Sequence, residues 1–108
     1  MPLEPRLRNI LAEYRHRLVE ILGDELDELI VYGSQARGGA EDDSDIDVLC
    51  VMKHSFDYGA LVLRTAPVSS ELGLRHNVVI STTFATRSEY ESRQTPFLIN
   101  VRREGISV

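Results

Sequence analysis

The sequence has almost no cysteine, no long apolar run and no excess of positive charge. Its one cysteine, Cys50, excludes an internal disulfide framework and any zinc site built on cysteines. No apolar stretch approaches the roughly 20 residues of a membrane-spanning helix, so we expect no membrane association. The N-terminal stretch carries scattered charges and no apolar signal core, which argues against secretion and favours a cytoplasmic location.

The charge balance also limits the partners of this protein. Seventeen acidic residues against twelve basic ones give a net charge of −5. Direct nucleic-acid binding is therefore not expected, because phosphate contacts need clustered lysine and arginine. The 108 residues, 43% of them hydrophobic, suffice for one core, and we expect a single domain over residues 1–108.

Hydrophobic spacing predicts an alternation of helices and strands. Apolar residues three and four positions apart predict a helix over 3–22 that ends at Gly23. Apolar runs predict strands at 26–32, 45–52 and 77–84, and a short strand at 106–108. Residues 34–40 favour one or two helical turns, and 55–73 reads as a helix kinked or divided by Pro67. Further helices are expected to start with Ser88 as the N-cap and after Pro96, the last ending at Gly105.

This order of elements predicts the fold class α/β (α+β), a small mixed β-sheet flanked by helices. The strands at 45–52 and 77–84 are joined by a helical segment and should be parallel. The strands at 26–32 and 45–52 are joined by a loop, and the sequence leaves their relative direction open.

The residues with the clearest chemistry lie between 33 and 47. Side chains alternate along a strand, so Asp45 and Asp47 should share one face, roughly 6–7 Å apart. Paired carboxylates suit Mg²⁺, which prefers oxygen ligands and shares its coordination with substrate phosphates. Gly33 lets the backbone approach a ligand closely, and Ser34 with the N–H groups of the following turn can hold a phosphate. Together these residues outline a site for a metal and a nucleotide.

The pattern Gly33-Ser34, ten residues, Asp45-x-Asp47 resembles the signature of the DNA polymerase β superfamily of nucleotidyltransferases. The longer string GSQARGGAEDDSDIDVLCV is similar to its minimal nucleotidyltransferase branch. The resemblance implies the nucleotidyltransferase fold and the transfer of a nucleoside monophosphate, usually AMP from ATP, to a hydroxyl acceptor. It also implies a small helical partner of the HEPN or substrate-binding type, in some pairs as antitoxin to a toxin.

The resemblance assigns roles residue by residue. Gly33 and Ser34 match the pair that grips the phosphates, and Asp45 and Asp47 match the carboxylates that bridge two Mg²⁺ ions about 3.5–4 Å apart. Two alternatives are open for Arg37. It either lies near the phosphates or is a surface residue that pairs with the acidic run at 41–43.

A third carboxylate, which full enzymes of the superfamily carry on a neighbouring strand, is missing. No Asp or Glu occurs between Leu72 and Ser88. Strand alternation favours Asn77 as the third metal ligand, with an ordinary strand-edge role as the alternative. His76 keeps a minor claim as a substitute base, and Cys50 should be a buried small hydrophobe.

Two functions are consistent with the sequence. The first is an active, metal-dependent nucleotidyltransferase that modifies a protein or a small-molecule hydroxyl. The second is a catalytically weak binding module that acts by docking onto a partner protein. The intact Gly-Ser and Asp-x-Asp pairs favour the first function, and the missing third acid favours the second.

Overall fold

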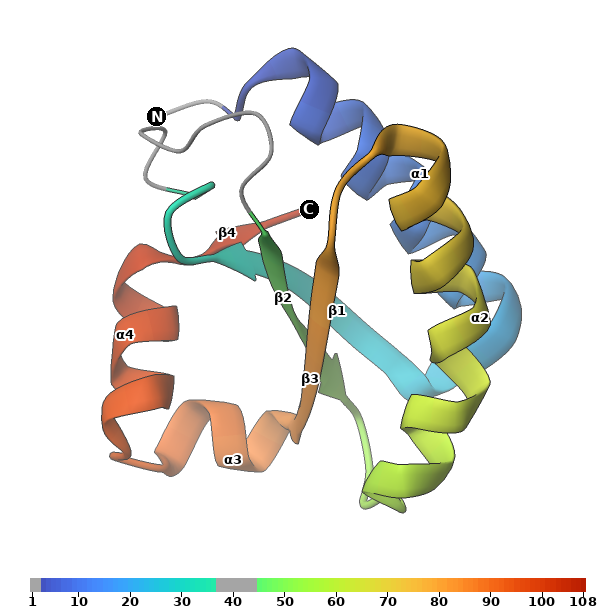
Figure 1. Cartoon of the computed structure of the whole chain (residues 1–108). Helices are drawn as coiled ribbons and strands as arrows, with labels where there is room; N and C mark the ends of the chain where they lie inside the picture. The colour runs from blue at the N-terminus through green and yellow to red at the C-terminus, as the bar shows by residue number, and fades with distance from the viewer. Residues whose placement is uncertain (1–2, 37–44) are drawn as a thin grey trace.

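A computed structural model of the chain describes residues 3–36 and 45–108 (Figure 1). In the described residues, helices lie on both sides of one four-stranded sheet, which confirms the predicted mixed sheet flanked by helices. The elements in chain order are α1 (Pro5–Leu22), the 3-10 turn η1 (Gly23–Glu25), β1 (Leu26–Tyr32), β2 (Ile46–Met52), α2 (Tyr58–His76), β3 (Ile80–Thr86), α3 (Arg87–Ser92), α4 (Pro96–Glu104) and β4 (Ile106–Ser107).

The register of the sheet brings the ends of three strands together. The strand order is β3-β2-β1-β4, and β2 is parallel to β3, as predicted. β1 is antiparallel to β2 and to β4, which settles the pairing that the sequence left open. In this register Asp47 lies between Tyr32, the last residue of β1, and Ser81, near the start of β3.

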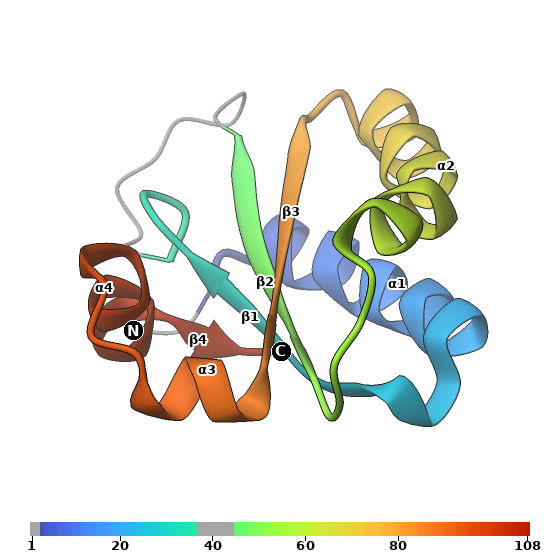
Figure 2. The same cartoon turned by 90° about the horizontal axis from the view of Figure 1, so that it is seen from below.

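Helices α1 and α2 cover one face of the sheet, as Figure 2 shows. The apolar stripe of α1 buries Leu11, Tyr14 and Leu18 completely, and Glu4 caps the helix by accepting hydrogen bonds from the backbone N–H groups of Arg6 and Leu7. Cys50 belongs to the same core, as predicted, and its burial raises the pKa of the thiol to about 12. The strand residues that this core buries are Leu26, Leu29, Val31, Ile46, Val48, Cys50, Met52 and Phe84.

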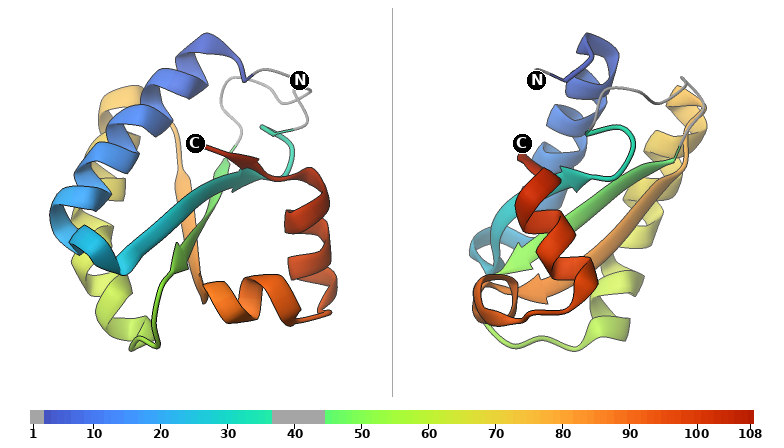
Figure 3. Two further views of the ribbon diagram at one scale, coloured as in Figure 1. Left: turned by 180° about the vertical axis from the view of Figure 1, so that it is seen from behind. Right: turned by 90° about the vertical axis from the view of Figure 1, so that its left-hand side faces the viewer.

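Helices α3 and α4 cover only part of the opposite face, as both views of Figure 3 indicate. A smaller cluster forms there from Ile30, Leu49, Val51, Ala85, Leu98 and Val101. This cluster extends as far as the partly buried Tyr32. Beyond Tyr32 the same face continues to Asp47 and Ser81, which are only partly buried. The polar corner of the sheet therefore lies where the second helical layer ends.

The predicted strand 77–84 begins later in the structure. β3 starts at Ile80, and Asn77 is the C-cap of α2, with a left-handed backbone at φ 56°. The physical reason is local: the N–H groups of Asn77 and Val78 both donate to the carbonyl of Gly73 and close the helix end. Asparagine tolerates this conformation better than most residues do. Asn77 therefore lies outside β3, and strand alternation does not apply to it.

Two helix predictions need adjustment. Pro67 lies inside one helix, Tyr58–His76, so the alternative of two separate helices is wrong; the buried residues Leu61 and Leu72 hold both halves against the core. Thr86, not Ser88, is the N-cap of α3, where it forms a capping box with Glu89. Residues 34–36 form a turn, and the rest of the predicted helical turns, 37–40, falls outside the described residues. None of the helices in the described ranges has both the length and the apolar character needed to cross a membrane.

Candidate active site

Asp45 and Asp47 lie at the start of β2, on the face opposite α1 and α2. Their neighbours Ile46 and Val48 point into the main core, so alternation turns the two aspartates the other way. Asp45 is exposed and Asp47 is partly buried. Burial raises the pKa of Asp47, and the nearby charge of Asp45 raises it further. The repulsion expected of two same-face carboxylates is therefore present in the folded chain.

Gly33 lies directly against the Asp47 carboxylate. A Cβ atom built on Gly33 would stand 2.8 Å from Asp47 Oδ2, a separation that real Cβ atoms essentially never show. Gly33 also has φ 77°, a left-handed conformation that favours glycine. The glycine is thus required twice, by the turn that ends β1 and by the space that the carboxylate occupies.

Of the two other predicted phosphate-binding residues, the structure describes Ser34 but not Arg37. Ser34 is in the turn that follows Gly33 and is partly buried, so it lies at the same corner of the sheet as Asp47. Its contact with phosphate stays a prediction. Arg37 falls outside the described residues, and so does the acidic run at 41–43, its alternative partner. Both readings of Arg37 therefore stay predictions.

The sequence did not indicate that a pair of aromatic side chains lies next to Asp47. Tyr32 is the cross-strand neighbour of Asp47, and its ring meets that of Phe97 edge to face, with 5.3 Å between the centroids. Burial raises the pKa of Tyr32, and the charge of Asp47 adds to the shift. Tyr32 directly precedes Gly33 in the sequence, which is a hint that it belongs to the site. Only the antiparallel register of β1 and β2 shows that it lies beside Asp47.

The position beside Asp47 on β3 is Ser81, not Asn77. Strand β3 contributes hydroxyl groups but no carboxylate to this face. His76, the substitute base, is in the last turn of α2, where its Nε2 lies 3.2 Å from Glu13 Oε1 on α1. Among the described residues, no group of three or more His, Cys, Asp or Glu side chains is placed to hold a metal ion.

The chemistry of this corner follows from its donors. Two carboxylates that lack a third protein ligand in the described chain suit Mg²⁺, which commonly takes one or two carboxylates and completes its coordination with water and substrate phosphates. The raised pKa of Asp47 fits a position where a cation is favourable. Gly33 leaves the backbone open to a ligand at the same point. These features make this end of the sheet the candidate site for a metal ion and phosphate.

Comparison with solved structures identifies the fold as that of a nucleotidyltransferase. Residues 8–102 match the model of the nucleotidyltransferase domain family, and the chain belongs to that family.

Relatives agree with this assignment. A candidate protein adenylyltransferase of Methanocaldococcus jannaschii is 28% identical over 101 residues, which cover 92% of this chain and 95% of the relative. A solved structure of a candidate minimal nucleotidyltransferase superposes with a TM-score of 0.61 at 22% identity, covering 94% of this chain and 95% of that one. A crystal structure of a toxin–antitoxin with AMP-PNP gives a TM-score of 0.61 at 16% identity, covering 88% of this chain and 69% of that one. At these identities the two structures support the fold alone.

Proposed function

We propose that this chain transfers AMP from ATP to a hydroxyl group of a partner protein, with Mg²⁺ held by Asp45 and Asp47. The observation that carries the proposal is the close approach of Gly33 to Asp47, 2.8 Å from a built Cβ to Oδ2. This approach places the Gly33-Ser34 pair, which we propose binds phosphate, next to the Asp45-x-Asp47 pair, which we propose binds the metal. Without that approach the two pairs would be unrelated short motifs.

The proposed reaction assigns each group a task. The acceptor oxygen bonds to the α-phosphorus of ATP, the bond from that phosphorus to the oxygen bridging the β-phosphate breaks, and pyrophosphate leaves with the electron pair. Gly33, Ser34 and Arg37 hold the phosphates, and Asp45 and Asp47 position the metal. Bound Mg²⁺, as two ions, supplies neutralisation of the developing charge. The acceptor proton passes to solvent, because β3 has no carboxylate beside Asp47.

The comparisons support the choice of AMP and of a protein acceptor. The Methanocaldococcus jannaschii relative, which this chain covers almost completely, carries the name of a protein adenylyltransferase. The similar toxin–antitoxin structure contains AMP-PNP, an ATP analogue, together with a protein pair. We therefore propose a small helical protein, of the HEPN or substrate-binding type, as the acceptor and partner, with this chain as the antitoxin.

A second function is favoured by Ser81. The hydroxyl at this position has no charge with which to bind a metal or accept the acceptor's proton. The alternative is a catalytically weak domain that acts by docking onto its partner. Under this alternative the partner binds equally well without ATP, and no AMP is transferred.

Label transfer from ATP tests the proposal. The chain and the product of the neighbouring gene are incubated with Mg²⁺ and ATP labelled at either the α- or the γ-phosphate. We expect only α-label on the acceptor, and none when Asp45→Asn and Asp47→Asn are combined. A stable complex without any transfer would establish the docking alternative. Transfer of γ-label would overturn the reaction type.

Ser81 offers a sharper variant. Ser81→Asp adds a carboxylate beside Asp47 and should raise the transfer rate by up to ~10²-fold, the lower end of general-base assistance. Ser81→Asn is the matched control, since it has the same size without the charge. An equal rate in both variants would mean that the partner protein supplies the base.

A further inference from the structure

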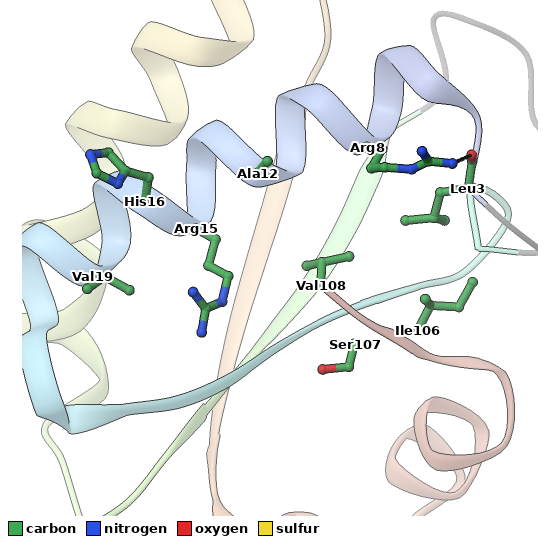
Figure 4. A pocket seen from close by; sticks show the side chains of 9 residues that line it. All are labelled: Leu3, Arg8, Ala12, Arg15, His16, Val19, Ile106, Ser107 and Val108. Atoms are coloured by element: carbon green, nitrogen blue, oxygen red, sulfur yellow. Dashed lines mark hydrogen bonds between the residues drawn. The ribbon is translucent and has the colours of Figure 1, made fainter.

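A groove of about 630 Å³ lies between α1 and β4, away from the carboxylates. Figure 4 shows α1 on one side of this groove and the end of the chain on the other. Ala12 and Val19 line the helical side, and Ile106 and Val108 face them. The groove is on the α1 side of the sheet, whereas Asp47 faces the α4 side. It is therefore a surface separate from the candidate active site.

The ionisable side chains that the described residues place in this groove are all of the basic type. Arg8, Arg15 and His16 line it, and no described Asp or Glu side chain does. Arg8 donates a hydrogen bond to the carbonyl of Leu3, and Arg15 makes no hydrogen bond or ion pair with the described residues. By contrast, Arg17, on the same helix, is paired with Glu71 on α2 at 2.9 Å. In a chain of net charge −5, two arginines without a carboxylate partner in the described ranges favour an acidic ligand.

The groove runs beside the outer edge of the sheet that the described residues form. β4 is the outermost strand in the order β3-β2-β1-β4. The N–H of Val108 donates to the carbonyl of Leu29 on β1. Backbone groups alternate in direction along a strand, so the N–H and C=O of Ser107 point to the outer side. An exposed edge of this kind accepts an additional strand.

We propose that an extended acidic segment of a partner protein docks here by adding a strand beside β4. The segment pairs with the backbone of Ser107 and places carboxylates opposite Arg8 and Arg15. These two arginines are seven helical positions apart, about 10–11 Å along α1. Same-face positions four residues apart on a strand span about 13 Å. The segment therefore carries two acidic residues four positions apart, with an apolar residue midway that faces Ala12.

A second copy of this chain fits the groove less well. Two copies joined by their β4 edges about a two-fold axis would present the same surface to each other. Arg8 and Arg15 of one copy would then approach the basic residues of the other, and like charges oppose association. Charge complementarity selects a different, acidic chain.

A designed peptide tests the proposal directly. The probe is a fluorescein-labelled octapeptide with two glutamates four positions apart and valine midway, titrated by anisotropy at low ionic strength. Combining Arg8→Glu with Arg15→Glu should weaken its binding by about tenfold or more, the sum of two exposed ion pairs. The control combines Lys53→Glu with Arg103→Glu, which makes the same change in net charge outside the groove and should leave binding unchanged. Equal weakening in both double variants would overturn the proposal, as would no binding to the natural chain.

Two further measurements separate strand addition from simple charge attraction. Ser107→Pro removes the outward N–H without removing a hydrogen bond to β1, so it should abolish peptide binding and leave the melting temperature nearly unchanged. A peptide with lysines in place of glutamates should bind the Arg8→Glu, Arg15→Glu chain and not the natural one. If Ser107→Pro is folded and binds the acidic peptide normally, no strand forms and the proposal fails. Should Ser107→Pro unfold, protection of the Ser107 amide from hydrogen exchange on peptide addition decides the same point.

Discussion

The two faces of the sheet differ in what they bury. Under α1 and α2, Leu29, Val48 and Met52 are almost completely buried in one large apolar cluster. On the opposite face the smaller cluster under α3 and α4 ends at Tyr32, beside a partly buried carboxylate. Helices α1 and α2 cover one face, and on the other face α3 and α4 do not reach the polar corner.

Ion pairing follows the same division. The outer surface of α1 and α2 joins Glu13 to Arg75 and Glu71 to Arg17. No lysine or arginine among the described residues pairs with Asp45 or Asp47. The main core and the candidate site thus lie on opposite faces of one small sheet. Truncating a core side chain should therefore lower stability, whereas removing the Ser34 hydroxyl should weaken binding.

The largest effect on stability should come from the α1 face. Leu11→Ala removes a completely buried side chain and should lower the free energy of unfolding by about 2–5 kcal/mol. Leu74→Ala is the matched control, because Leu74 is 86% exposed, and it should change stability by less than about 0.5 kcal/mol. Urea denaturation measures both. Similar losses in the two variants would show that burial under α1 and α2 does not determine the stability.

Two glycines compare backbone strain with strain plus collision. Gly33→Ala and Gly23→Ala both place a side chain at positive φ and should each cost about 1–3 kcal/mol of stability. A Cβ at Gly23 meets nothing within 4 Å, whereas at Gly33 it collides with Asp47. Only Gly33→Ala should therefore lose Mg·ATP binding, as followed by calorimetry. Retained binding in Gly33→Ala would separate Gly33 from the site.

Ser34 should affect binding and not folding. Ser34→Ala removes a hydroxyl from the turn after β1 and should weaken ATP binding by about 0.5–1.5 kcal/mol, the worth of one hydrogen bond. Ser70→Ala, at an exposed position on α2, is the control. A loss of cooperative unfolding in Ser34→Ala without a specific loss of binding would make Ser34 a structural cap.

The smallest effect concerns pH. Because burial raises the pKa of Asp47 in the folded chain, the folded chain binds this proton more tightly than the unfolded chain does. Ionisation of Asp47 therefore lowers metal-free stability as the pH rises from 3.8, the ordinary pKa of an aspartate, through the raised pKa of the folded chain. Asp47→Asn should be at least as stable as the natural chain at neutral pH, and its advantage should shrink below that window. Thermal melts across pH check the sign, and a destabilised Asp47→Asn at neutral pH would contradict it.

Features that depend on neighbouring residues were readable from the sequence. Helical periodicity alone predicts the apolar stripe of α1. Short sequence motifs identify Gly33-Ser34 and Asp45-x-Asp47, and in the structure Gly33 lies against Asp47. The parallel pairing of β2 and β3 follows from the helix that joins them. Local sequence patterns were therefore sufficient to predict the fold class and the residues of the candidate site.

Features that depend on distant residues could not be predicted from the sequence. Asn77 is a different case, because it was misassigned for a local reason: the N–H groups of Asn77 and Val78 donate to the carbonyl of Gly73 and end α2 there. Tyr32 becomes part of the site through antiparallel pairing with β2, and Ser81 through parallel pairing with the other edge of β2. The identity of the residue beside Asp47 is a property of the register, which strand periodicity alone leaves undetermined.

Calorimetry of Mg·ATP binding decides whether Asp45 and Asp47 hold the metal. The natural chain and the chain with Asp45→Asn plus Asp47→Asn are titrated with ATP, with and without Mg²⁺. We expect Mg²⁺-dependent binding to the natural chain and its loss in the double variant, with melting temperatures showing that the variant stays folded. Equal affinity of both chains for Mg·ATP would contradict the assignment of Asp45 and Asp47 as the metal-binding pair.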